Sequence, residues 1–237
     1  RTFEFQKGPI FSHVILADQI NRGTPKAQSA LLEAMEGQSV SVANETFQLP
    51  TPFTVFATQN PLEMEGTFPL PEPEIDRFLL KLLVASPSEA ELEQILDRTT
   101  EGEPPVVARV TDERRLMEMR EVARAVPAPA QVKRLAASLV AATHPDRDRA
   151  PPMVRKYVRY GASPRGAQAL LIAAKVRAIV EGRGEVSTDD VRAVAPAALR
   201  HRMILNFEGQ AEDVSGDRLV EAVVESVLAP AGGEVVA

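Results

Sequence analysis

The 237-residue sequence contains no cysteine. This absence excludes disulfides, thiolate metal sites and cysteine nucleophiles, and it fits a protein of the reducing cytoplasm. No apolar stretch reaches the roughly 18 residues that a membrane helix needs, and the start does not resemble a signal peptide, so neither membrane insertion nor export is predicted. The net charge of −6 comes without a long basic run, so nothing in the charge pattern indicates a nucleic-acid-binding surface.

The chain is long enough for one large domain or two modest ones, and its first 85 residues differ in character from the rest. His13–Ala17 and Phe53–Ala57 are predicted as buried strands, and a helix is expected to begin at Thr24-Pro25 and to end at Gly37. Buried strands that alternate with helices indicate an α/β fold whose parallel sheet is covered on both faces.

A hairpin is predicted between this helix and the second buried strand. Ser39–Ala43 and Thr46–Leu49 have strand patterns, and Asn44-Glu45 supplies the turn. The tip has no basic residue, which argues against a role in DNA binding.

Residues 86–237 form an all-helical bundle in this interpretation, and the Ala-Ser-Pro stretch near residue 86 is the expected domain boundary. The predicted helices are Ser88–Arg98, Asp112–Ala125, Ala130–Thr143, Pro164–Glu181, Thr188–Arg200 and Asp217–Leu228. Ser86-Pro87-Ser88, Ser163-Pro164 and Ser187-Thr188 have the residue types that cap helix N-termini.

Polar residues follow the two buried strands. Asp18 and Gln19 come directly after the first strand, and Asn60 follows the second. A carboxylate at the end of a parallel strand is well placed to bind Mg²⁺ through water beside a phosphate chain, and an amide can bind a γ-phosphate or the attacking water. The alternatives are a strand-terminal aspartate that caps a turn and an ordinary Asn-Pro turn.

Two arginines are candidates for phosphate contact. Arg77 precedes an apolar run, where it could reach the nucleotide of a neighbouring subunit, although a surface pair with Asp76 or Glu74 is the alternative. Arg165 lies in the first turn of a helix, where a cation is mildly unfavourable. An anion at that place would resolve the conflict, because backbone N–H groups and a guanidinium both suit phosphate.

The order and spacing of these residues are highly specific in combination. The segments that carry the resemblance are Gly8–Phe11, Leu16–Arg22, Gln28–Met35, Ala57–Pro61, Glu65–Glu72, Asp76–Phe78, Gly161–Arg165 and Leu199–Arg202. Through them the chain resembles the MoxR family of AAA+ ATPases, in the clade that also holds magnesium chelatases and replicative helicases, from about residue 5 to residue 210.

The resemblance implies a P-loop NTPase core over residues 1–85 and a helical lid domain over residues 86–237. Asp18 matches the Walker B aspartate, Asn60 sensor 1, Arg77 the arginine finger and Arg165 sensor 2. The hairpin at residues 38–49 resembles the pre-sensor-1 insertion, which tends to face the central pore in ring-shaped relatives. The family's properties imply a hexamer that uses ATP and Mg²⁺ to remodel a protein partner, commonly one with a von Willebrand A domain.

Gln19 departs from the family pattern, because the Walker B glutamate is expected there. A neutral amide can orient water but cannot accept its proton, and loss of a general base typically costs about 10²–10⁴-fold in rate. We therefore expect ATP binding without appreciable turnover. Three interpretations remain open: a chaperone-like ATPase in an engineered, arrested form; a non-catalytic regulatory subunit in which Gln19 is natural; and a DNA-directed member of the clade.

A glycine-rich phosphate loop followed by lysine is also missing; Lys7-Gly8 has the two residue types in reverse order. That loop lies upstream of Walker B in the family, and we interpret the chain, which begins at Arg1 without methionine, as a piece of a longer protein. Residues 1–237 alone would lack the groups that hold the α- and β-phosphates, so they are expected to bind ATP weakly or not at all.

Overall fold

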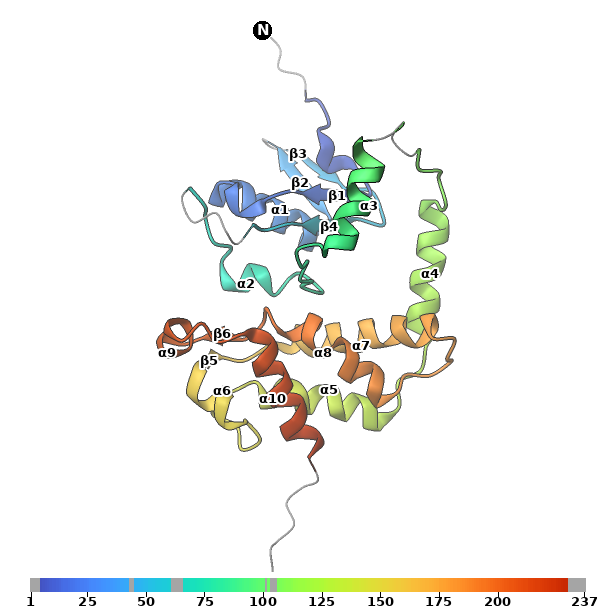
Figure 1. Cartoon of the computed structure of the whole chain (residues 1–237). Helices are drawn as coiled ribbons and strands as arrows, with labels where there is room; N and C mark the ends of the chain where they lie inside the picture. Colours follow the sequence, from blue (N-terminus) through green and yellow to red (C-terminus); the bar gives the residue numbers. More distant parts are fainter. Residues whose placement is uncertain (1–4, 43–44, 61–65, 101, 103–105, 230–237) are drawn as a thin grey trace, which may run out of the picture.

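The computed structural model describes residues 5–42, 45–60, 66–100, 102 and 106–229. The strands and helix of the first part lie in the upper half of Figure 1, and the helices from residue 130 onward lie in the lower half. Helix α4 (Glu113–Ala125) runs between the two groups. The arrangement agrees with the expected change from an α/β part to a helical part.

Two parallel strands form the sheet of the α/β part. Strand β1 (Val14–Ala17) pairs with β4 (Thr54–Ala57), in a register that runs from Val14 opposite Thr54 to Ala17 opposite Ala57. The predicted parallel pairing is therefore confirmed. Parallel pairing also brings both strands to an end at the same edge of the sheet, where the predicted site residues follow.

The two faces of this sheet are not equally covered. Ala17 and Ala57 pack against an apolar cluster that includes Leu32 of the following helix. On the other face, Val14, Leu16 and Phe56 are 54%, 67% and 59% exposed. Within residues 1–237, α1 covers one face of the sheet, and the described residues do not supply the expected cover of the other face.

Helix α1 (Pro25–Gly37) begins and ends as its sequence predicts. The side chain of Thr24 accepts a hydrogen bond from the Ala27 amide at 3.3 Å, and Pro25 occupies the first turn. After Gly37, the hairpin of β2 (Ser39–Val42) and β3 (Glu45–Gln48) follows directly. Of the two predicted turn residues, Asn44 lies outside the described residues, and Glu45 is the first residue of β3.

The predicted long helices are present with small shifts at their ends. Besides α4 they are α3 (Glu89–Thr100), α5 (Ala130–Ala142), α7 (Pro164–Val180), α8 (Thr188–Leu199) and α10 (Gly216–Leu228). The sequence analysis missed the short elements η1 (Pro9–Phe11), η2 (Ile20–Arg22), α2 (Glu72–Ile75), α6 (Pro152–Tyr157), β5 (Val158–Tyr160), β6 (Ile204–Leu205) and α9 (Phe207–Ala211). These segments are too short for a hydrophobic period to identify them.

The helical part has a closed core. Helices α5, α7, α8 and α10 surround a cluster whose fully buried members include Leu139, Leu170, Leu199 and Leu219. The loop between α7 and α8 is held by Asp190, which is buried, caps α8 together with Ser187 and pairs with Arg183. No helix in the described parts of the chain is long and apolar enough to cross a bilayer.

Candidate functional site

The ends of β1 and β4 bring the side chains of Asp18 and Thr58 and the backbone of Gln19 together. The Thr58 hydroxyl donates a hydrogen bond to Oδ1 of Asp18 at 2.5 Å, and it accepts one from the backbone N–H of Gln19 at 2.8 Å. The Asp18 side chain is exposed. Thr58 therefore fixes the orientation of the carboxylate and of the residue that follows it.

Gln19 has an unusual backbone conformation. Its φ of 50° and ψ of 53° lie in the left-handed region, which residues other than glycine rarely adopt and which is a recurrent source of strain at functional sites. Its side-chain Oε1 accepts a hydrogen bond from Nη1 of Arg22 at 3.1 Å. The backbone conformation and the hydrogen bond from Arg22 thus hold the side-chain amide of Gln19 in a defined orientation.

Asn60 joins this group through the backbone. Nδ2 of Asn21 donates to the Asn60 carbonyl at 3.3 Å, and the Ile20 amide donates to the Thr58 carbonyl at 3.0 Å. The side chain of Gln28, which is 2% exposed, supports the same loop through Nε2, which lies within 3.2 Å of the carbonyl oxygens of residues 20, 23 and 68. In the sequence, the only signal of this supporting role is a glutamine among the core-facing positions of α1.

The two candidate arginines meet elsewhere, on a single carboxylate. Nη2 of Arg77 lies 2.9 Å from Oε2 of Glu36, and Nη2 of Arg165 lies 3.0 Å from Oε1 of the same side chain. The alternative of a surface pair between Arg77 and Asp76 or Glu74 is therefore wrong in this structure. In this structure the Arg165 guanidinium is paired with the Glu36 carboxylate, and a phosphate at that place stays a prediction.

The loop before α7 is fixed by its surroundings. Ser163 caps the helix by accepting a hydrogen bond from the Arg165 amide at 3.1 Å, and its hydroxyl donates to Oδ2 of Asp76 at 2.7 Å. At Gly161 a Cβ atom would lie 2.7 Å from the carbonyl oxygen of Thr143, so only glycine fits there. These contacts hold Arg165 at the junction between the helical part and α2.

Arg202 is a component of the junction that the sequence analysis did not recognise. Its side chain is 2% exposed, pairs through Nε with Oδ1 of Asp76 at 2.9 Å, and donates to the carbonyl groups of residues 76, 78, 79 and 198. Burial lowers the pKa of the Arg202 guanidinium below its usual value, and the nearby charge of Arg165 adds to the effect. The segment after α2 is thereby attached to the helical core.

His201 lies beside Arg202 and has a structural role. Its Nε2 contacts the Phe78 carbonyl at 3.1 Å, which makes the neutral ring the donor. Burial, followed by the charges of Arg202 and Lys81, lowers the pKa of His201 to about 4. His13 and His144 likewise contact backbone carbonyl oxygens. Among the described residues, no cluster of three or more histidine, aspartate or glutamate side chains could hold a metal ion.

The residues at the strand ends suit a Mg²⁺ ion bound mainly by water and phosphate oxygens. One exposed carboxylate, Asp18, is oriented by a hydroxyl group through only one of its two oxygens. Mg²⁺ commonly keeps several water ligands and takes one or two carboxylates from the protein.

Arg77 and Arg165 form a group separate from the strand ends. The Glu36 carboxylate that they share lies eight residues after Gln28 on α1, or about 12 Å along the helix axis, and Gln28 is the residue of α1 that contacts the strand-end loop.

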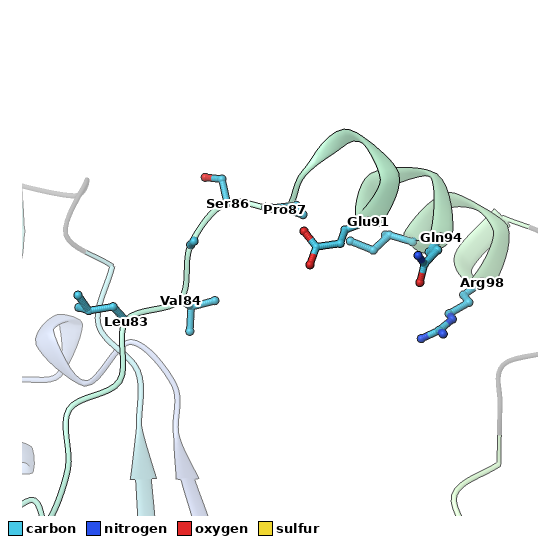
Figure 2. Close-up of a pocket in the computed structure, with 9 residues that line it drawn as sticks. Leu83, Val84, Ser86, Pro87, Glu91, Gln94 and Arg98 are labelled. Atoms are coloured by element: carbon cyan, nitrogen blue, oxygen red, sulfur yellow. The ribbon is translucent and has the colours of Figure 1, made fainter. Parts of the chain in front are cut away.

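A hollow lies between the extended segment after α2 and helix α3. Figure 2 shows Leu83 and Val84 on one side and Glu91, Gln94 and Arg98 along α3 on the other. Its volume is about 580 Å³. None of the described site residues lines it, so we do not assign the predicted chemistry to this hollow.

Comparison with known proteins agrees with this geometry. Residues 1–80 match the ATPase family associated with various cellular activities (AAA), and residues 152–223 match the AAA lid domain. A crystal structure of a protein from Cytophaga hutchinsonii superposes with a TM-score of 0.88 at 35% identity, over 94% of this chain and 68% of that one. The fold and these matches define a P-loop AAA-type ATPase core with an AAA lid.

Sequence identity to curated proteins shows the family to which the chain belongs. YeaC of Bacillus subtilis is 41% identical over 96% of this chain and 69% of its own length. The chaperone MoxR1 of Mycobacterium tuberculosis is 37% identical over 96% of this chain and 60% of its own, and MoxR of Methylorubrum extorquens is 34% identical over 92% and 66%. The chain belongs to the MoxR family of AAA+ ATPases, and it spans 60% to 69% of the length of these three relatives.

Proposed function

We propose that this chain is part of a MoxR-type ATPase that uses ATP and Mg²⁺ to remodel or activate a protein partner. The observation that carries the proposal is the arrangement at the strand ends, where Thr58 joins Asp18 to the backbone of Gln19. A relative named as a chaperone, MoxR1, supports the type of activity.

Asp18 would hold Mg²⁺ through water, with the Thr58 hydroxyl keeping the carboxylate turned toward the edge of the sheet. When bound, Mg²⁺ neutralises phosphate charge and orients the triphosphate. Asn60 would hold the γ-phosphate or the attacking water through its amide. The α- and β-phosphates would be held by a phosphate loop upstream of residue 1, and without it we expect weak ATP binding at most.

Gln19 would orient the attacking water without taking its proton. An amide has no basic group at neutral pH, and its Oε1 already accepts a hydrogen bond from Arg22. We propose that the protein binds ATP and turns it over slowly. The same observation favours the second candidate function, a regulatory subunit that binds ATP and controls assembly.

Arg77 and Arg165 would bind the terminal phosphate as a pair. Both reach one carboxylate, so a single anion can contact both guanidinium groups. Because α1 separates them from Asp18, we propose that they serve the nucleotide of a neighbouring subunit in a ring, with a hexamer as the expected assembly. A protein with a von Willebrand A domain is the expected partner, and nucleic acid is not.

We also propose a division of the chain near residue 86 into the C-terminal part of the AAA+ core and the lid. The separate apolar clusters around Leu32 and Leu170 support this division. Leu80, which packs against the helical cluster, shows that the segment before the boundary takes part in the junction.

The test is ATP turnover by the complete protein, including its upstream region, with Gln19 and with Gln19→Glu. We expect glutamate to raise turnover by about a hundredfold or more, because it restores a general base. Gln38→Glu is the matched control, since Gln38 also has a left-handed backbone, with φ of 49°, but lies at the end of α1 away from Asp18.

Three results are informative. A large rise with Gln19→Glu alone supports an arrested ATPase. ATP binding without turnover by either form supports the regulatory subunit. Rapid multiple turnover by the Gln19 protein would contradict the proposed role of this residue.

A further inference from the structure

The carboxylate of Glu36 accepts contacts from both candidate arginines, one on each oxygen. Oε2 lies 2.9 Å from Nη2 of Arg77, and Oε1 lies 3.0 Å from Nη2 of Arg165. A phosphate group also presents several oxygens to more than one guanidinium. Glu36 therefore occupies a position between the two arginines that a phosphate would suit.

The charges around this carboxylate are unbalanced. Arg77, Arg165 and Arg202 share two carboxylates, Glu36 and Asp76, so the group has one more positive than negative charge. Without Glu36 the excess would rise to two charges at short range. Glu36 thus keeps Arg77 and Arg165 close together when no other anion lies between them.

The two carboxylates differ in how firmly they are held. The Asp76 side chain is 18% exposed, pairs with buried Arg202 and accepts a hydrogen bond from Ser163. The Glu36 side chain is 52% exposed, and its two pairs resemble surface ion pairs, which are individually weak. A more highly charged anion can displace Glu36 far more easily than Asp76.

Glu36 also connects the two parts of the molecule. It lies in the last turn of α1, whereas Arg165 lies in the first turn of α7, 129 positions later in the chain. Loss of this contact would leave Asp76 bound to Ser163 and Arg202 and would remove the ion pair that joins α1 to α7. The pair between Glu36 and Arg165 can therefore break while Asp76 keeps its contacts with Ser163 and Arg202.

We infer that Glu36 is a positioning residue that occupies the place of the ATP γ-phosphate between Arg77 and Arg165 and competes with it. The inference rests on the proposed function, because it requires the two arginines to bind nucleotide. Binding of the γ-phosphate displaces Glu36 and breaks the contact between α1 and α7. ADP, which lacks this phosphate, leaves the contact in place.

The test compares ATPγS and ADP binding to the complete, assembled protein with Glu36 and with Glu36→Gln. We expect the dissociation constant for ATPγS to fall by about 3–10-fold, because no charged group competes for the arginines, while that for ADP changes by less than about twofold. Glu33→Gln is the matched control: it removes the same charge from α1 at an exposed position one turn earlier, and Glu33 has none of these contacts.

A double variant, Glu36→Gln with Arg165→Ala, should lose the gain in ATPγS affinity. An unchanged ratio of ATPγS to ADP affinity in Glu36→Gln, or the same change in Glu33→Gln, would overturn the inference while leaving the proposed function intact. Failure of the unsubstituted protein to bind either nucleotide would overturn both.

Discussion

The two parts of the molecule bury their apolar residues to very different degrees. In the helical part, Leu139, Leu170 and Leu199 are at most 1% exposed, and they belong to one continuous cluster. In the α/β part, Leu16 and Phe56 lie in the middle of the sheet and are 67% and 59% exposed. Within the described residues, the helical part closes its own core, whereas the α/β part covers only one face of its two-stranded sheet.

This difference has a physical reason. A helix buries one stripe of its surface, so a few helices can surround a core, but a parallel strand presents apolar residues to both of its faces. The α/β part therefore depends on contacts beyond its own described elements, among them the attachment of residues 76–79 to Arg202. Three predictions test this comparison.

The largest effect is expected at the junction. Arg202→Ala should lower the free energy of unfolding by about 3–5 kcal/mol, because it leaves the partly buried Asp76 carboxylate and several carbonyl groups without their partner. Urea denaturation followed by circular dichroism measures it. Arg192→Ala, at an exposed position on α8, is the control, and its effect should stay within about 0.5 kcal/mol. A loss below about 1 kcal/mol for Arg202→Ala would show that the junction is not held by this side chain.

Within residues 1–237, truncation of an apolar side chain should lower the free energy of unfolding more in the helical part than on the exposed face of the sheet. Leu170→Ala removes a fully buried side chain and should cost about 2–5 kcal/mol, whereas Phe56→Ala removes a mostly exposed ring and should cost less than about 1 kcal/mol. The same denaturation measurement compares them. Equal losses would mean that the open face of the sheet is covered in solution, for example by association of two chains.

Acid should weaken the junction through His201. Its folded pKa of about 4 lies below the unfolded value of about 6.5, so the unfolded chain binds more protons between these values. The stability that this residue contributes is complete above about pH 6.5 and is lost as the pH falls toward 4. In His201→Gln, which keeps a donor for the Phe78 carbonyl, the loss of stability over this range should be smaller, by on the order of 2 kcal/mol. If the free energy of unfolding changed with pH in the same way in both proteins, the lowered pKa of His201 would be contradicted.

Much of the fold could be predicted because its signals are local. The proline and threonine at the start of α1, the serine caps of α7 and α8 and the apolar runs of β1 and β4 each depend on neighbours within a few positions. The short elements α2, α6 and α9 were missed, because four to six residues carry no measurable period.

The candidate site was predictable in part for the same reason. Asp18, Gln19 and Asn60 follow two strands, and parallel pairing brings strand ends together without further information. The left-handed backbone of Gln19 and the linking hydroxyl of Thr58 were not predictable, because they depend on how the two strand ends meet.

The sequence by itself determined the class of fold, the helices and their caps, and the types of residue at the strand ends, because periodicity and capping act over short distances along the chain. Only the tertiary structure decided that Arg77 and Arg165 share Glu36 and that Asp76 binds Arg202. Each of these depends on side chains far apart in the sequence, and a charged residue has many partners of opposite sign until folding brings one of them within reach.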